Sequence, residues 1–302
     1  MGIHQIEPRT KGILLVLCGG ILWGASGVAA QYLLLEKAFS PEWLVVVRMI
    51  TAGSLLLGYD YKKNNGDIFP IWKNKHDRRQ LLLFGFVGMF SVQYTYFLAI
   101  QYSNAATATI LAYLMPTIIV VYFACHTRHW PSTGQNIALF LAMLGTYLLV
   151  TKGDFTNLAI SPAALFWGIA SAFSGAFYTV QPKYLLSHYR SPLVIGWSML
   201  VVGIALIPIN PPWQFVGIWD YNAFGALAFI IVFGTVIAFY AYLDSIRYIQ
   251  PSETGTIASV EPLAAVFLSV YLLNTPFGYI DCLGGLCIIS TVFILARTNA
   301  SQ

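Results

Sequence analysis

The sequence predicts an all-α polytopic membrane protein, with ten transmembrane helices arranged as two inverted repeats of five helices. Composition, the length of the apolar stretches and a weak internal repeat predict this class. Of 302 residues, 58% are hydrophobic and 9% are charged, whereas soluble domains carry about 25% charged residues. So few charges cannot cover the surface of a soluble protein of this size. The low charge and the 15% aromatic content also exclude a disordered chain.

The apolar stretches have the length of membrane helices. A spanning helix needs about 20 apolar residues, and the long stretches here carry no charged residue or only one. The charge-free residues 80–127 divide at Gln101-Tyr102-Ser103-Asn104 into two helices. The predicted spans are residues 12–34, 41–60, 80–101, 104–126, 133–151, 161–184, 191–209, 222–246, 253–273 and 277–296. Barrel strands are about half as long and alternate in polarity, so helices are expected.

The basic residues predict the orientation. If the N-terminus is cytoplasmic and the spans alternate, thirteen of the 16 Lys and Arg residues fall inside. Lys37 and Lys152 fall outside, and Arg48 lies within a span. By the positive-inside rule this split predicts an integral cytoplasmic (inner) membrane protein with both termini cytoplasmic. The first span is expected to be retained, because it lacks the polar cleavage region of a signal peptide.

Two parts of the chain resemble each other. Shifting the sequence by 146 residues places residues 88–120 over residues 234–266. The identical pairs are Gly88/Gly234, Tyr94/Tyr240, Tyr96/Tyr242, Ile100/Ile246, Tyr102/Tyr248, Ala112/Ala258, Pro116/Pro262 and Val120/Val266. A five-helix unit has an odd number of spans, so its second copy must be inverted in the membrane, as in many secondary transporters. The predicted units are residues 1–152 and 153–302.

The sequence resembles the EamA-type branch of the drug/metabolite transporter superfamily. The resemblance rests on ILWGASGVAAQ (21–31), SPEWLVVVRMITAG (40–53), YFLAIQYSNAATATILAYLMP (96–116) and YLDSIRYIQPSETGTIASVEPLAAVFLSV (242–270). It implies a ten-helix transporter of small metabolites, commonly an exporter. Family members often carry a Glu after the fourth and ninth helices. This chain has HTRHW and Asn274 there, so no role of that Glu is carried over.

Two charged residues are predicted to lie at membrane depth. At a rise of 1.5 Å per residue, Arg48 lies about 11 Å beyond Pro41, and Glu261 lies about 12 Å beyond Glu253. They approach the midplane from opposite faces, which allows either a direct ion pair or a shared polar cavity. Buried ionisable residues of membrane proteins usually serve function. Glu261 is therefore expected to bind a proton or a substrate amine, and the alternative is a static structural pair.

Two prolines and one ion pair are predicted to serve movement. Pro116 and Pro262 occupy equivalent interior positions of helices four and nine, where each frees a backbone carbonyl that needs another partner in a membrane. Each is interpreted either as a hinge or broken-helix site or as a packing kink. Asp244 and Arg247 lie three residues apart, a spacing at which helical side chains meet. They form either an interfacial pair or a cytoplasmic gate.

Aromatic and amide side chains are predicted to line a pocket. The candidates are Gln93, Tyr94, Tyr113, Trp167, Tyr178 and Gln181. Aromatic faces with a few polar groups suit an amphipathic solute or a cation. For any single one of these residues, lipid contact or packing is the alternative interpretation.

Taken together, the sequence predicts a secondary active transporter, an exporter of amino acids or related compounds, with alternating access that is coupled either to a proton or to the substrate gradient. The alternatives are another solute class (nucleotide sugar, amine or choline-like compound, drug), an intramembrane enzyme and a channel. The sequence has no GK[ST] phosphate loop, no HExxH and no GxSxG. We expect the lipid bilayer and a small-molecule substrate as partners, no nucleic acid, no metal and no cofactor. The chain is expected to be a monomer or a homodimer.

Overall fold

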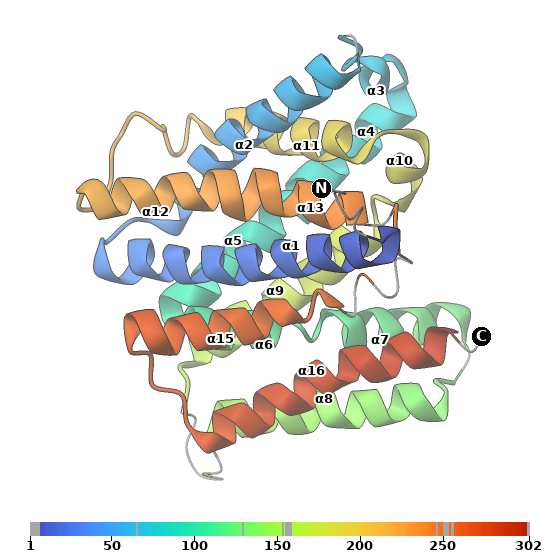
Figure 1. The fold of residues 1–302 in the computed structure, drawn as a ribbon, viewed down its shortest axis with the longest axis vertical. Helices are drawn as coiled ribbons and strands as arrows, with labels where there is room; N and C mark the ends of the chain where they lie inside the picture. Colours follow the sequence, from blue (N-terminus) through green and yellow to red (C-terminus); the bar gives the residue numbers. More distant parts are fainter. Residues whose placement is uncertain are drawn as a thin grey trace, which may run out of the picture.

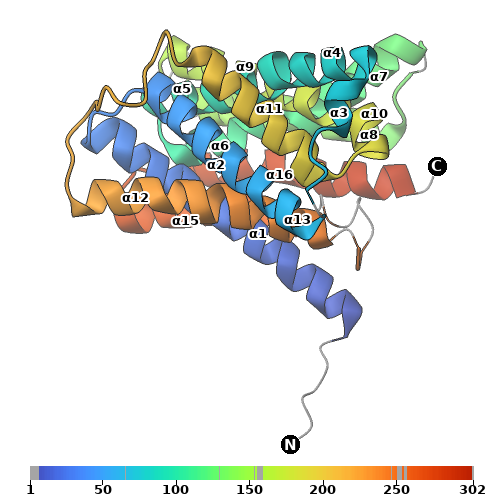
Figure 2. The ribbon, with the colours of Figure 1, turned by 90° about the horizontal axis from the view of Figure 1, so that it is seen from above.

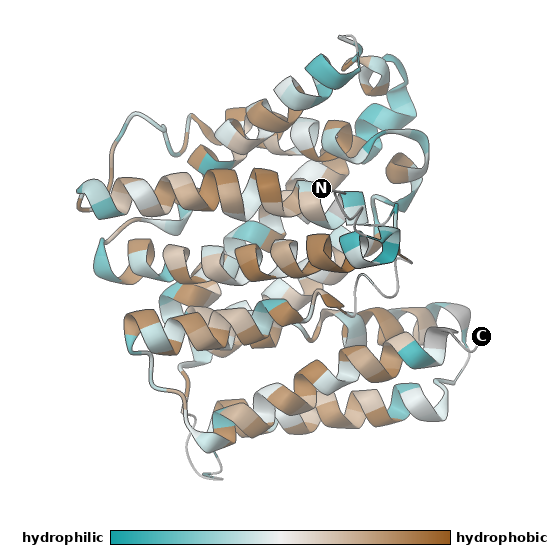
Figure 3. Cartoon of the chain, in the orientation of Figure 1, coloured by the Kyte–Doolittle hydropathy of each residue, from teal (hydrophilic) through white to brown (hydrophobic). Residues whose placement is uncertain are grey.

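The computed structural model describes residues 7–64, 66–128, 130–152, 154, 159–245, 247–249, 254 and 257–300. All regular elements in these ranges are helices (Figure 1). Eight helices are long and apolar enough to cross a membrane, and the shorter apolar helices Ser191–Leu206 and Val260–Leu273 bring the number to ten. Apolar residues cover the helices along most of their length (Figure 3). The predicted fold class is confirmed.

The first repeat contains five spans. Its elements are α1 (Pro8–Gln31) continued by the π-helix η1 (Tyr32–Glu36), α2 (Pro41–Lys63), α3 (Pro70–Lys73), α4 (Lys75–Leu83) continued by η2 (Phe84–Phe90) and α5 (Ser91–Tyr102), the half-helices α6 (Ala105–Ala112) and α7 (Met115–Thr127), and α8 (Thr133–Thr151). Local sequence explains several helix starts. Ser40 directly precedes Pro41, and its hydroxyl accepts a hydrogen bond from the Trp43 N–H. Ser132 forms a capping box with Gln135. Both arrangements satisfy N–H groups that have no partner within the helix.

The second repeat is built in the same way. Its elements are α9 (Pro162–Val180) followed by α10 (Lys183–His188), α11 (Ser191–Leu206), α12 (Tyr221–Ile231) continued by η3 (Val232–Ile237) and α13 (Ala238–Ser245), α15 (Val260–Leu273), and α16 (Tyr279–Ala300). Ser161 caps α9 by accepting from the Ala164 N–H, and Asp220 caps α12 by accepting from the Ala223 N–H. Side chains that favour helix starts therefore set the spans of both repeats.

The contacts between the repeats follow a two-fold pattern. The second helices pair as α2 with α11, and the fifth helices pair as α8 with α16 (Figure 1). The first helix of each repeat packs on the third and fourth helices of the other: α1 lies on α13 and α15, while α9 lies on α5 and α6. Exchanging the repeats therefore maps each contact onto another, as two inverted copies require.

Local irregularities repeat at the predicted shift. The aligned glycines Gly88 and Gly234 lie in π-helical segments, η2 and η3. Arg128 and Asn274, which are 146 residues apart, end α7 and α15 with positive φ angles of 55° and 49°. These irregularities are spaced as the repeat predicts.

Some predicted span boundaries need correction. The third span begins at Lys75 rather than at residue 80, because its first turn carries charged residues. Asn74 caps this turn by accepting from the His76 N–H. The fourth span is broken at Tyr113 and Leu114 instead of running through residues 104–126. The predicted start of the ninth span, Glu253, lies outside the described residues.

The start of α1 and the end of α16 lie at the same side of the molecule (Figures 1 and 2). An even number of spans requires this placement. The helices α3 and α4, which carry several of the basic residues, lie at that side as well (Figure 1). Which side faces the cytoplasm stays a prediction.

Candidate functional site

Two broken helices, one from each repeat, meet inside the bundle. The first is interrupted between α6 and α7 at Tyr113 and Leu114, and α15 of the second follows a turn at Ala258 and Ser259. Pro116 is the second residue of α7, and Pro262 is the third residue of α15. The sequence left open a hinge or broken-helix site and a packing kink at each proline. In the structure a turn precedes each proline, and each lies at the start of the following helix, where a missing N–H is tolerated because it would lack a helical partner.

Tyr113 joins the two breaks. Its hydroxyl lies 3.0 Å from the Ala258 carbonyl oxygen and 3.1 Å from Oε2 of Glu261. In a continuous helix the Ala258 carbonyl would accept from the N–H of residue 262, but that residue is proline. The tyrosine of the first repeat thus offers a donor to the carbonyl that Pro262 leaves free.

Helix α1 covers this junction because glycine permits a close approach. A Cβ on Gly24 would lie 2.6 Å from the Glu261 carbonyl oxygen and 2.9 Å from the Ala265 nitrogen. A Cβ on Gly20 would lie 3.2 Å from the Ala258 carbonyl oxygen. Any larger side chain at Gly24 would push α1 away from the start of α15.

Arg48 reaches the interior from α2 and is 8% exposed. Its Nε donates to Oγ1 of Thr235 at 2.8 Å, and the Thr235 hydroxyl donates to the Ile230 carbonyl at 2.8 Å. The guanidinium carbon lies 5.6 Å from the centroid of the Phe97 ring, a cation–π distance. Within the described part of the chain, no carboxylate lies at ion-pair distance from Arg48. The cation is held by a hydroxyl and a ring, and no described residue supplies an acidic partner.

Arg48 and Glu261 share a polar region rather than a direct ion pair. The Tyr96 side chain interacts electrostatically with both, and its hydroxyl hydrogen-bonds to Oγ1 of Thr109 at 2.7 Å. Tyr178 interacts electrostatically with Arg48, and Tyr242 with Glu261. Because no ion pair joins Arg48 to Glu261 among the described residues, the shared region is favoured over a direct pair, with tyrosines of α5, α9 and α13 within electrostatic range of one or both charges.

The predicted aromatic residues divide into two groups. Tyr178 stacks on Phe84 at 5.4 Å between ring centroids and faces the Arg48 region. Tyr94 and Trp167 form an edge contact at 6.3 Å, and the Tyr94 hydroxyl donates to Oε1 of Glu42 at 2.9 Å. Tyr94 and Trp167 thus belong to a cluster near the start of α2.

The two glutamines predicted for the pocket are differently placed. Gln93 is buried, and its Nε2 donates to the Met89 carbonyl at 3.4 Å, while its Oε1 has no hydrogen-bond partner within the described residues. Gln181 donates to Oε1 of Gln80 at 2.8 Å and thereby ties the end of α9 to α4. The contacts of Gln181 connect helix ends, and it does not join the group around Arg48 and Glu261.

One end of the molecule holds a contact between α2 and α13. Asp244 and Arg247 form the predicted i, i+3 ion pair at 3.2 Å. Beside it, the Tyr59 and Tyr240 rings meet at 5.4 Å, and Nζ of Lys63 donates to the Tyr59 hydroxyl at 3.0 Å. These contacts join the two repeats at the end predicted to be cytoplasmic, and a gating role stays a prediction.

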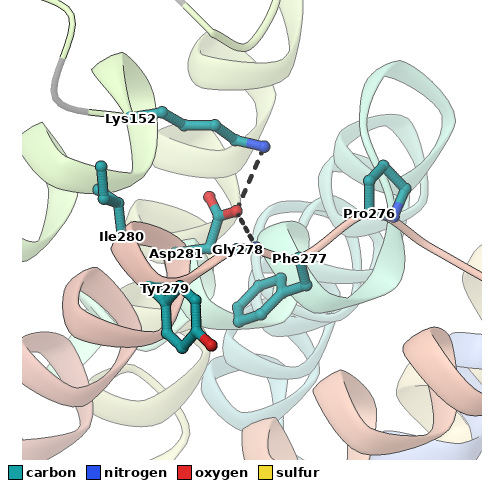
Figure 4. Close-up of a pocket in the computed structure, with 7 residues that line it drawn as sticks. All are labelled: Lys152, Pro276, Phe277, Gly278, Tyr279, Ile280 and Asp281. Carbon is teal, nitrogen blue, oxygen red and sulfur yellow. Dashed lines mark hydrogen bonds and ion pairs between the residues drawn. The ribbon is translucent and has the colours of Figure 1, made fainter.

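The opposite end carries two ion pairs between the repeats. Lys37 pairs with Asp220 at 2.6 Å, and Lys152 pairs with Asp281 at 3.2 Å beside a surface pocket (Figure 4). The hydrogen bond from Lys37 lowers the pKa of the Asp220 carboxyl, and the same bond raises the pKa of Lys37. The two lysines predicted to lie outside therefore link one repeat to the other.

Three residues of the shared region were missing from the predicted site: Tyr96, Tyr242 and Thr235. Tyr96 and Tyr242 are one of the identical pairs of the repeat, so the repeat itself could have indicated them. No sequence signal pointed to Thr235, because its role depends on how α2 and η3 cross.

The two buried charged residues, Arg48 and Glu261, have no charged counterpart at the equivalent position of the other repeat. At the 146-residue shift, Glu261 corresponds to Met115. At the 151-residue shift that aligns Ser40-Pro41 with Ser191-Pro192, Arg48 corresponds to Met199. An apolar residue therefore serves the fold at each equivalent position, which favours a functional reason for the charges.

Known proteins resemble this chain over nearly its whole length. The EamA-like transporter family model matches residues 10–151 and 162–297. A Salmonella typhimurium protein named "Uncharacterized inner membrane transporter YicL" is 41% identical over 287 residues, 95% of each chain. "Uncharacterized transporter YetK" of Bacillus subtilis is 25% identical over 96% of this chain and 88% of its own. A solved structure described as "Crystal structure of protein" has a TM-score of 0.63 at 17% identity, covers 96% of this chain and 99% of that one, and shares the fold.

Proposed function

The chain belongs to the EamA-like transporter family and is an integral inner-membrane transporter, not an enzyme. From this premise we propose that it is a secondary active transporter of small organic metabolites. The proposed substrates are amino acids or related compounds, exported by alternating access. The observation that carries the proposal is the convergence of Arg48 and Glu261, from opposite repeats, on one tyrosine-lined region.

The charges of this region suit a zwitterion. Beyond the Nε–H that donates to Thr235, Arg48 makes no hydrogen bond or ion pair with a described residue, so a substrate carboxylate supplies the missing anion. Glu261 then receives the ammonium group of the substrate, or a proton when the site is empty. Tyr96 and Tyr178 add hydroxyls and ring faces for the rest of the molecule.

Alternating access fits the contacts at the two ends. Tyr59 and Tyr240 join the repeats at one end, and Lys37 and Asp220 join them at the other. When the repeats rock about the interior site, one set opens while the other stays closed. Proton coupling places the proton on Glu261 in one of the two states.

The chemistry also ranks the other solute classes. A choline-like amine would find Glu261 and the tyrosine rings, but it would leave Arg48 without an anion. A nucleotide sugar offers phosphates to Arg48 and no cation to Glu261. An amino acid uses both charges, and it is therefore the first substrate to test.

The test uses the purified full-length protein. A thermal-shift screen of amino acids, amines and nucleotide sugars identifies ligands, and counterflow in liposomes then measures flux of each hit. We expect saturable uptake that is stimulated by substrate on the opposite side. Flux that neither saturates nor responds to substrate on the opposite side would contradict the proposal and favour a channel.

A further inference from the structure

We propose that the Tyr113 hydroxyl switches its hydrogen bond between the Glu261 carboxylate and the Ala258 carbonyl. Through this switch, protonation or ligand binding at Glu261 determines how well ordered the turn before α15 is. Tyr113 is then a positioning residue that acts through Glu261 and the backbone. The inference rests on the proposed function in one respect, that Glu261 takes up a proton or a substrate amine.

A phenol hydroxyl has one hydrogen to donate, and the two acceptors lie at nearly equal distances. Oε2 of Glu261 is 3.1 Å away and the Ala258 carbonyl oxygen is 3.0 Å away. A strong hydrogen bond requires the hydrogen to point at its acceptor, so the hydroxyl bonds one acceptor fully at a time. The geometry therefore defines two alternative states of the same side chain.

The second acceptor has an unusual need for this hydrogen. A carbonyl oxygen has two lone pairs, and that of Ala258 accepts from the Glu261 N–H at 2.9 Å. Its usual helical donor is missing because residue 262 is proline. With the Glu261 N–H as its one backbone donor among the described residues, this oxygen keeps a lone pair that only Tyr113 satisfies, and leaving that lone pair without a donor away from water costs free energy. Hydrogen bonding by Tyr113 thus stabilises the turn that precedes α15.

The charge of Glu261 decides between the states. An ionised carboxylate accepts a stronger hydrogen bond than a neutral carbonyl, so the hydroxyl then points to Glu261 and the turn loses a donor. Protonation makes the carboxyl a weaker acceptor, and a substrate ammonium that donates to Oε2 takes the place of the tyrosine hydrogen there, so in either state the hydroxyl turns to Ala258. Because Tyr113 belongs to the first repeat and Ala258 to the second, occupancy of the site changes a contact between the repeats.

Other groups around Glu261 do not compete for this role. Its described titratable neighbours are Tyr113, Tyr96 on α5 and Tyr242 on α13. Tyr96 shares a hydrogen bond with Thr109 of α6, and α1 presents glycine at Gly24. Near pH 7 the tyrosines stay neutral, so Glu261 is the described group that changes charge here.

Hydrogen–deuterium exchange of the full-length protein in nanodiscs, followed by mass spectrometry, tests the switch without a substrate. The measured quantity is the protection of the peptide that includes residues 257–262, corrected for intrinsic exchange, across a pH series. In the wild type we expect protection to fall about three- to tenfold as Glu261 ionises, since the difference between a charged and a neutral hydrogen bond is about 1 kcal/mol. Glu261→Gln should stay protected at all pH values.

Three further variants complete the test. Tyr113→Phe should be weakly protected at every pH. Pro262→Ala restores the N–H of residue 262, which can donate to the Ala258 carbonyl. The peptide of this variant should therefore be protected at every pH. This expectation does not depend on whether Tyr113→Phe folds well. Tyr271→Phe, which changes a tyrosine exposed on the same half-helix, should behave like the wild type.

A wild-type pH response that survives in Tyr113→Phe or in Pro262→Ala would overturn the switch, as would its absence from the wild type. Counterflow reports separately on the proposed function. A failed switch with intact counterflow refutes this inference alone, whereas a working switch without saturable flux refutes the transporter mechanism.

Discussion

Replacement of Arg48 by methionine is the most informative single substitution, because Met199 occupies the equivalent position of the second repeat. The account assigns Arg48 to the substrate carboxylate rather than to the fold. Loss of a hydrogen bond that involves a charged group costs about 1.5–3 kcal/mol. If this interaction binds the substrate, its affinity falls about 10- to 150-fold, at 1.4 kcal/mol per factor of ten.

The structure predicts a small effect on stability from the same change. Thr235 keeps its hydrogen bond to the Ile230 carbonyl after Arg48 is removed, so its hydroxyl hydrogen stays paired. A buried charge pays a desolvation cost that an apolar side chain avoids. Arg48→Met should therefore unfold at a temperature equal to or above that of the wild type.

The assay pairs counterflow in liposomes with thermal unfolding in detergent. Arg48→Lys serves as the matched control, since it keeps the charge but loses the planar donor geometry, and it should fall between the wild type and Arg48→Met. Unchanged kcat/KM in Arg48→Met would refute the assignment to substrate. A large fall in the unfolding temperature would show instead that Arg48 serves the fold.

Three other predictions use different parts of the structure. Gly24→Val should lower the unfolding temperature and abolish counterflow, because its Cβ would meet the Glu261 backbone, whereas Gly58→Val, with open space around the Cβ, should leave both unchanged. The pKa of Asp220 is lowered in the folded protein. The Lys37 ion pair therefore stabilises the fold at pH values above the unfolded Asp pKa of about 3.9. This stabilisation is lost as the pH falls through the folded pKa of Asp220. Acid titrations of unfolding should show the loss in the wild type and a smaller loss in Lys37→Met, where the Ala223 N–H still donates to Asp220. Glu261→Gln should weaken exchange of substrate for substrate, because it removes the partner of the substrate ammonium, and should abolish the response of net flux to an imposed pH gradient; an unchanged pH response would remove Glu261 from proton coupling.

Much of the fold could be predicted from local sequence. The scarcity of charge identified the membrane, and the predicted starts of the second and seventh spans, at residues 41 and 191, agree with the helix starts at Pro41 and Ser191. Boundaries that charge obscures were harder, as at Lys75, where a polar first turn continues into an apolar span. The sequence left open whether the helix breaks or only kinks near Pro116, because a half-helix that begins near a proline has the same apolar composition as a kinked helix.

The candidate site could be predicted only in its charged residues. Arg48 and Glu261 stand out because charge is rare in a span. Tyr113 resembles any other interior tyrosine in sequence, and its importance comes from lying between Glu261 and a carbonyl of the other repeat. Gln181 shows the reverse case, since a polar residue near the predicted pocket bonds Gln80 at a helix end. Contacts between elements decide such roles, and a single sequence does not specify them.

The central claim is that the region between Arg48 and Glu261 opens to each side of the membrane in turn. The most direct measurement labels Tyr178→Cys, in a chain whose Cys18, Cys125, Cys282 and Cys287 are replaced by serine, with an impermeant thiol reagent applied to one side of oriented liposomes. The account predicts labelling from either side, and protection by substrate from both. Labelling from one side only, whatever the substrate or the pH, would contradict alternating access.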